Sequence, residues 1–162
     1  MNMRRKDREV TDICQIKTIL DDCKTCHLAM VDEGQPYVVP LNYAYVIDDN
    51  VLTLFFHSAM EGRKIKILRD NSSVCFEMSK EGEPIFAEQT PCNSGYYYAS
   101  VHGFGHVQFI EDVGEKCSAL TLLMKHQANI DVCFTKDQAN SVCVFKVTST
   151  DFTGKAKPRS SE

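Results

Sequence analysis

Apolar residues recur at helical spacing near the start of the chain. They are Ile13, Ile16, Ile19 and Leu20. Thr11 and Asp12, which precede them, are residue types that cap helix N-termini, because their side-chain oxygens accept hydrogen bonds from the free N–H groups of the first turn. The pattern predicts a helix that begins after Asp12 and ends at about Asp22.

Three strand-like segments rich in Val, Ile and Tyr come next. The turn-forming runs Asp32-Glu33-Gly34-Gln35 and Asp48-Asp49-Asn50 separate them. We therefore expect strands at 27–31, 37–47 and 51–57, which follow one another in antiparallel order.

The second half of the chain alternates in the same way between helix and strand patterns. Gly103 and Gly105 interrupt its longest strand, where they fit a bulge or a close approach by a ligand or another backbone. In chain order, the pattern predicts a helix at 59–68, a strand at 73–79, a long loop at 80–95, a strand at 96–110, a helix from 111 to about 127 and a final strand at 141–147.

Six or so antiparallel strands with three short helices indicate a mainly β fold. Since closure of a sheet removes its exposed edges, we expect a small β-barrel with α insertions that cap it. The 162 residues of the chain are enough for one domain and few for two. We expect a single domain over residues 1–154 and a polar C-terminal tail over 155–162.

Composition narrows the classes of function. A formal net charge of -4 argues against a general nucleic-acid binder, because such a surface has to neutralise many phosphates. No apolar run is long enough to span a membrane. The basic residues near the start, Arg4, Arg5, Lys6 and Arg8, precede no apolar run of secretory length, so a cytoplasmic protein is expected, with its eight cysteines mostly reduced.

A possible anion site lies at the start of the helix predicted over 59–68. Arg63 and Lys64 fall in its first turn, where the helix dipole disfavours cations by about 0.3–1 kcal/mol each. A phosphate would offset this cost, because free backbone N–H groups and two basic side chains would converge on it. Ser58 can add a hydroxyl, and Gly62 lets an anion approach the backbone. The same pattern also fits a solvated helix face.

The segment Pro36-Tyr37-Val38-Val39-Pro40-Leu41-Asn42-Tyr43 is strand-like but has a proline at its centre. Because Pro40 cannot donate to a ladder, an edge, a bulge or a break is expected there. Backbone groups freed at such a place can bond the polar edge of a flat heterocycle. A simple edge strand also explains the proline.

The pentapeptide Cys23-Lys24-Thr25-Cys26-His27 fits the pattern for covalent haem attachment. Such attachment requires export, which is not expected here. A zinc site that uses Cys14, Cys23, Cys26 and His27 lacks a second ligand pair at standard spacing. We therefore expect no metal site, and a Cys/His metal-binding module and a redox pair of Cys23 and Cys26 stand as alternatives.

Five segments combine in one order over nearly the whole chain. They are the Met3-Arg-Arg-Lys-Asp-Arg-Glu9 start, Pro36 to Tyr43, Phe56 to Lys64, Tyr98-Ala99-Ser100-Val101 and Thr153-Gly154-Lys155. Together they resemble the flavin-binding split-barrel proteins related to pyridoxamine 5'-phosphate oxidase, and within that family the nitroimidazole-resistance (Nim-type) branch.

The resemblance implies a homodimer with two FMN sites at the subunit interface. Arg63 and Lys64 would hold the FMN phosphate, beside Ser58, Gly62 and His57. The implied contacts to the isoalloxazine ring are Val39, Pro40, Leu41 and Asn42, while Ser100 and Val101 would reach the site from the partner subunit.

The implied reaction is reduction of the nitro group of an imidazole drug to the amine. His57 is the candidate for proton handling or substrate contact, because histidine titrates near neutral pH, and a role as hydrogen-bond ligand of the ring or phosphate stays open. The alternative function is a flavin-binding protein of the same fold with a different oxidoreductase substrate, or a flavin-storage protein. The electron donor is open too, since no G-x-G-x-x-G fingerprint occurs.

Overall fold

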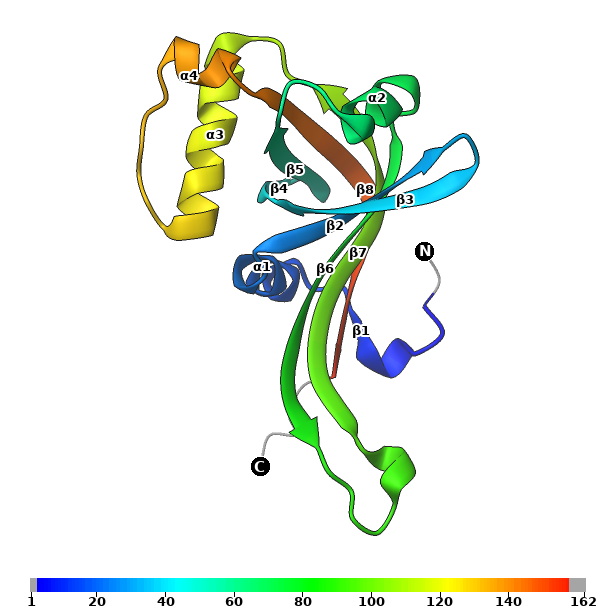
Figure 1. Ribbon diagram of the computed structural model, residues 1–162. Helices are drawn as coiled ribbons and strands as arrows, with labels where there is room; N and C mark the ends of the chain where they lie inside the picture. The colour runs from blue at the N-terminus through cyan, green and yellow to red at the C-terminus, as the bar shows by residue number, and fades with distance from the viewer. Residues whose placement is uncertain (1–2, 158–162) are drawn as a thin grey trace.

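The computed structural model describes residues 3–157 and forms one antiparallel sheet with helices around it (Figure 1). Six strands lie in about the first half of the chain: β1 (Glu9–Val10), β2 (Thr25–Asp32), β3 (Gln35–Asn42), β4 (Ala44–Asp48), β5 (Val51–Ser58) and β6 (Ser73–Ile85). Two long strands follow: β7 (Gly95–Phe109) and β8 (Cys143–Lys157). The helices are α1 (Ile13–Asp22), α2 (Arg63–Asp70), α3 (Val113–Ala128) and α4 (Lys136–Asn140), with short 3-10 turns η1 (Lys6–Arg8) and η2 (Pro91–Asn93). The mainly β prediction is confirmed, with eight strands in place of about six.

The strands lie in the order β3-β2-β6-β7-β8-β5-β4, and β1 pairs with β8. The stretch predicted as one strand over 37–47 is two strands at opposite ends of this order, so that prediction was wrong. Tyr43 separates them. Its side chain is fully buried, and its hydroxyl donates to the carbonyl oxygen of Leu20 at 2.8 Å. The sheet curls so that β3 also approaches β5. Pro40 lies in β3, an edge strand that pairs with β2 alone in the described part of the chain.

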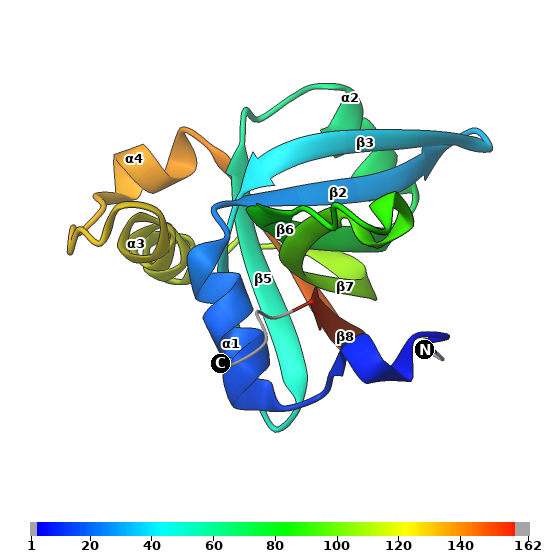
Figure 2. The ribbon, with the colours of Figure 1, turned by 90° about the horizontal axis from the view of Figure 1, so that it is seen from below.

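The main core lies inside the curled sheet. Phe56 of β5 and Phe145 of β8 are paired in register, and their rings stack at 5.2 Å between centroids. Helix α1, which Asp12 caps by accepting from the N–H of Gln15, turns Ile16 and Leu20 into this core. Helices α3 and α4 cover a second, smaller cluster at the β4 and β5 end (Figure 2).

The loop predicted over 80–95 was partly wrong. β6 continues to Ile85 and pairs with the start of β7, forming a hairpin arm that extends from the body of the molecule (Figure 1). The register shifts between Glu81 and Pro84, because Pro84 offers no N–H to the ladder. Residues 80–85 form a strand because they pair with β7, and their local composition does not predict this pairing.

Two elements near the C-terminus also differ from the prediction. Helix α4 was missed, because five residues are too few for a periodic signal, although Thr135 and Gln138 form a capping box. β8 continues through Lys157, so the residues 155–157 of the predicted tail belong to the sheet, and 158–162 lie outside the described residues. Within 3–157, no helix has the length and apolar character needed to cross a lipid bilayer.

Candidate functional site

The turn between β5 and α2 forms a small cationic site. β5 ends at Ser58, and α2 begins at Arg63 with Gly62 as its N-cap residue. Gly62 has a φ of 137°, which residues with a side chain rarely adopt, and nothing lies within 4 Å of the position its Cβ would take. Because no side chain among the described residues caps this helix end, its first N–H groups are available to an anion.

Arg63 is positioned by two residues of the β2–β3 hairpin. Its guanidinium donates from Nε to the carboxylate of Asp32 at 2.9 Å and lies 4.5 Å from the ring centre of Tyr37. Nothing in the sequence pattern indicates Asp32 or the ring of Tyr37 as a partner of Arg63. Their contact depends on the curl of the sheet, for which no local signal exists.

Lys64 and His57 flank the same turn, close enough for the charge of Lys64 to act on the imidazole. Burial lowers the pKa of Lys64. Burial also lowers the pKa of His57, and the nearby charge of Lys64 lowers it further. The structure thus favours a neutral His57 imidazole, which can accept a proton or a hydrogen bond.

Ser58 lies beside them but its hydroxyl is engaged. It is almost fully buried, and its Oγ donates to the carbonyl oxygen of Ala59 at 2.8 Å. Its oxygen can therefore accept a further hydrogen bond, while its proton is already used. The structure brings His57, Ser58, Gly62, Arg63 and Lys64 together around one turn. The local sequence pattern predicted this grouping for the last four residues, and the family resemblance added His57.

The four predicted ring contacts on β3 alternate between the two faces of the strand. Val39 and Leu41 pack against the main core, whereas Pro40 and Asn42 face outward. The Asn42 amide donates to the carbonyl oxygen of Lys24 at 3.1 Å and to Oε1 of Gln127 at 3.0 Å. Because both N–H groups of the Asn42 amide are already used, a flat ligand at the free edge of β3 would bond to backbone groups of the strand and not to this amide.

Ser100 and Val101 lie on β7, away from this turn. Val101 is fully buried in the core, and Ser100 faces outward with its Oγ 3.5 Å from the carbonyl oxygen of Lys155. In the described part of the chain, no hydrogen bond or ion pair joins either residue to α2. The predicted site residues are therefore split between two places on one chain.

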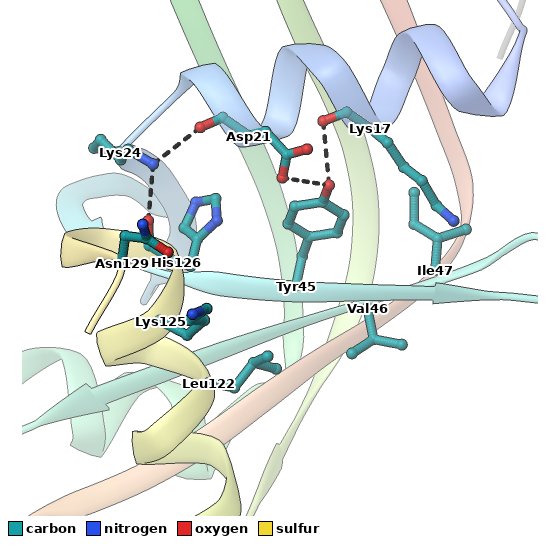
Figure 3. A pocket seen from close by; sticks show the side chains of 10 residues that line it. All are labelled: Lys17, Asp21, Lys24, Tyr45, Val46, Ile47, Leu122, Lys125, His126 and Asn129. Carbon is teal, nitrogen blue, oxygen red and sulfur yellow. Dashed lines mark hydrogen bonds between the residues drawn. The ribbon is translucent and has the colours of Figure 1, made fainter. Parts of the chain in front are cut away.

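A pocket of about 620 Å³ lies elsewhere, between α1, β4 and α3 (Figure 3). Lys24 spans it, donating to the carbonyl oxygens of Asp21 at 2.9 Å and His126 at 2.8 Å, near the C-terminal ends of two helices. The hydroxyl of Tyr45 donates to Asp21 at 2.7 Å. These contacts tie the helices together, and none of the predicted flavin contacts lines this pocket.

The Cys-x-x-Cys-His residues do not converge. Cys23 and Cys26 are buried, and burial raises the pKa of both thiols, which disfavours the thiolate form that binds metals. His27 faces the opposite side of β2, where its Nδ1 lies 3.1 Å from the carboxylate of Glu77. Among residues 3–157, no three His, Cys, Asp or Glu side chains gather in a way that could hold a metal ion.

Comparison with known proteins identifies relatives over most of the chain. The sequence profile described as pyridoxamine 5'-phosphate oxidase matches residues 13–156. A candidate 5-nitroimidazole antibiotic resistance protein from Bacteroides thetaiotaomicron superposes with a TM-score of 0.80 at 33% identity, covering 91% of this chain and 86% of the other.

More distant structures share the fold. A FAD-binding protein from Mesorhizobium loti has a TM-score of 0.66 at 24% identity, over 93% of this chain and 98% of that one. A FAD- and heme-binding protein from Mycobacterium smegmatis has a TM-score of 0.80 at 16% identity, over 96% and 76%. A comparison with curated proteins gives no significant match. Given the profile match and the 33% identity over most of both chains, the protein belongs to the pyridoxamine 5'-phosphate oxidase family.

Proposed function

We propose that this protein is an FMN-binding reductase of nitroimidazole-type compounds that acts as a homodimer in the cytoplasm. The observation that carries the proposal is the β5–α2 turn, where an uncapped helix N-terminus, Arg63 and Lys64 converge. The 33% identity to a candidate nitroimidazole resistance protein directs the choice of substrate.

The donor set of this turn fits the phosphate of FMN. A dianion matches two cationic side chains and free backbone N–H groups, and Gly62 leaves the space in which the anion can approach. Arg63 and Lys64 would hold the phosphate, and the free edge of β3 would bond the polar edge of the ring. A bound flavin supplies two-electron redox chemistry, while the protein binds and orients it.

His57 is placed for the protonic part of the reaction. Partial desolvation and the charge of Lys64 lower its pKa, which favours the neutral imidazole that can accept a proton. Complete reduction of a nitro group to an amine takes up six electrons and six protons and releases two water molecules. We assign to His57 the handling of protons beside the flavin.

A second chain would complete the site. Ser100 and the backbone of Val101 lie on β7, with no hydrogen bond or ion pair to α2 in the described part of the chain, and would reach the flavin from the partner. The outer face of β2, β3 and β7 exposes large apolar side chains: Val31 at 47%, Val38 at 54% and Phe104 at 49%. Covering such side chains is favourable, since each square ångström of apolar surface removed from water contributes about 25 cal/mol.

The absorption spectrum of the purified protein tests the proposal first. We expect a flavin spectrum, or its appearance after FMN is added, and a dimeric mass by sedimentation. Protein that is colourless and binds no added FMN would overturn the proposal. A turnover assay with a nitroimidazole and dithionite as reductant then separates the substrates. Bound flavin that is reduced without any loss of the drug would favour a different substrate or flavin storage.

A further inference from the structure

The two ends of the described chain bring basic residues together. β1 pairs with β8 so that Glu9 lies opposite Lys155, and the N-terminal segment lies beside the end of β8 (Figure 1). Arg5 and Arg8 from one end thereby meet Lys155 and Lys157 from the other. A cationic cluster on a chain of net charge -4 stands out, and the proposed flavin site does not use it.

Arg5, Arg8 and Lys157 of this cluster line a pocket of about 560 Å³ between the N-terminal segment and the outer part of the hairpin arm, where η2 leads into β7. Its lining includes Arg5, Arg8, Ser94, Tyr96, Tyr98 and Lys157. That volume is far larger than a single phosphate needs and lies within the range of sites for small organic ligands.

Tyr98 organises the cations. Its hydroxyl accepts a hydrogen bond from Nη1 of Arg8 at 3.2 Å, and the guanidinium carbon of Arg8 and Nζ of Lys155 lie 6.0 Å and 5.8 Å from its ring centre. Arg5 is paired with Asp7, to which its Nε donates at 2.8 Å. Lys157 makes no ion pair among the described residues. Nε of Arg8 lies at a longer 3.9 Å from the same Asp7 carboxylate, so Lys157 and then Arg8 are the cations most available to a ligand.

The position of the pocket links it to the proposed flavin site. Tyr98 pairs with Lys157 and Ser100 pairs with Lys155, so these four residues share one face of the β7–β8 ladder. Ser100 is the residue that the proposed dimer turns toward the flavin. A long ligand seated in the pocket would therefore extend along β7 toward the flavin ring.

We propose that this pocket binds the pyrophosphate of a dinucleotide, held by Arg8 and Lys157 with its base against Tyr96. Guanidinium and ammonium groups are suited to adjacent phosphates. The Tyr96 ring, 57% exposed at the pocket, offers a stacking surface for a base. The inference rests on the proposed function, because a flavin reductase needs an electron donor. A reduced nicotinamide dinucleotide is such a donor, and it contains a pyrophosphate and a base. FAD contains the same two groups in its adenylate half.

Calorimetric titration with inorganic pyrophosphate and with NADH tests the site without requiring flavin. We expect the wild-type protein to bind both, with affinity that falls as salt is raised. Arg8→Gln and Lys157→Gln should each weaken binding roughly tenfold, the loss of one charge-assisted contact. The matched control is Arg4→Gln, which removes the same charge from the same segment outside the pocket lining and should stay within about twofold. The double variant carries both Arg8→Gln and Lys157→Gln. Equal affinity for pyrophosphate in this variant and in the Arg4→Gln control, or no binding of either probe by the wild type, would overturn the inference.

Flavin content of the same proteins identifies the source of the pyrophosphate. Lost NADH affinity with unchanged flavin assigns the pocket to the electron donor. If the double variant loses FAD but still takes up FMN, the pocket holds the adenylate half of FAD. Dithionite-driven nitro reduction should survive in the double variant, so that failure of the proposed function and failure of this inference give different results.

Discussion

The two cationic sites of this molecule are built in opposite ways. The β5–α2 turn takes its cations from adjacent positions of the chain and holds one of them through Asp32 and Tyr37. The second site is the pocket lined by Arg8, Tyr98 and Lys157, here called the chain-end pocket. Its cations come from the two ends of the described chain and lie around Tyr98. The first adds backbone N–H groups at a helix start, whereas the second offers side chains along a strand ladder.

This difference fits two different anions. A helix N-terminus with Gly62 presents several donors to one compact group, such as a terminal phosphate. Cations spread over the N-terminal segment and β8 suit an extended group instead, such as a pyrophosphate with a base attached. Each site should therefore fail separately when its own residues are changed.

The largest effect is expected from removing both cations of the turn. Arg63→Ala with Lys64→Ala should weaken FMN binding by about a hundredfold or more, since two charge-assisted contacts of at least about 1.5 kcal/mol each are lost. Flavin fluorescence during titration measures this. Lys66→Gln is the matched control, because Lys66 is exposed on the same helix but lies beyond its first turn. A comparable loss in that control would show that only the general charge of α2 matters.

Separating the chain ends should have the next largest effect. A Cβ at Gly154 would lie 2.9 Å from Cβ of Val10, so Gly154→Val forces β1 away from β8. We expect the free energy of unfolding, measured with urea, to fall by about 1–3 kcal/mol. Pyrophosphate binding should be lost while FMN binding is kept. Parallel loss of both would contradict the independence of the two sites.

Sequence reasoning succeeded where the determinants are local. The α1 prediction rests on the Asp12 cap and apolar residues at helical spacing, and both are present in the structure. The grouping of Arg63, Lys64 and Gly62 in one turn follows from adjacency alone. These features need no knowledge of the rest of the sheet.

Sequence reasoning failed where strands exchange partners. Nothing in the apolar run of 37–47 shows that Tyr43 turns inward and sends the two halves to opposite ends of the sheet order. The arm strand at 80–85 is polar and contains Pro84, so only its partner on β7 reveals it. The chain-end pocket was missed for the same reason, because β1–β8 pairing brings its two halves together.

The pH dependence of stability tests the electrostatics of the β5–α2 turn. Folding lowers the pKa of His57 below its ordinary value of 6.5, through burial and then Lys64. The unfolded state therefore binds more protons as pH falls through 6.5, so the free energy of unfolding should decrease there and level off above it. Lys64→Met should raise the pKa of His57, measured by NMR of the ring protons. His126, whose pKa is lowered by burial and Lys24, is the internal control and should not move.

The smallest effect concerns the ion pair that holds Arg63. Asp32 and Arg63 are both partly exposed, so Asp32→Asn should change the free energy of unfolding by less than about 1 kcal/mol. FMN binding should nevertheless tighten several-fold, because the guanidinium is released and a negative charge beside the phosphate is removed. Glu33→Gln removes the same charge from the adjacent β2–β3 turn, where Glu33 makes no ion pair with Arg63 in the described part of the chain, so it controls for general charge. Weaker FMN binding in Asp32→Asn would instead show that Asp32 orients Arg63 toward the cofactor. The two sites would then be alike in one respect, because Asp32 would position Arg63 as Tyr98 positions Arg8 in the chain-end pocket.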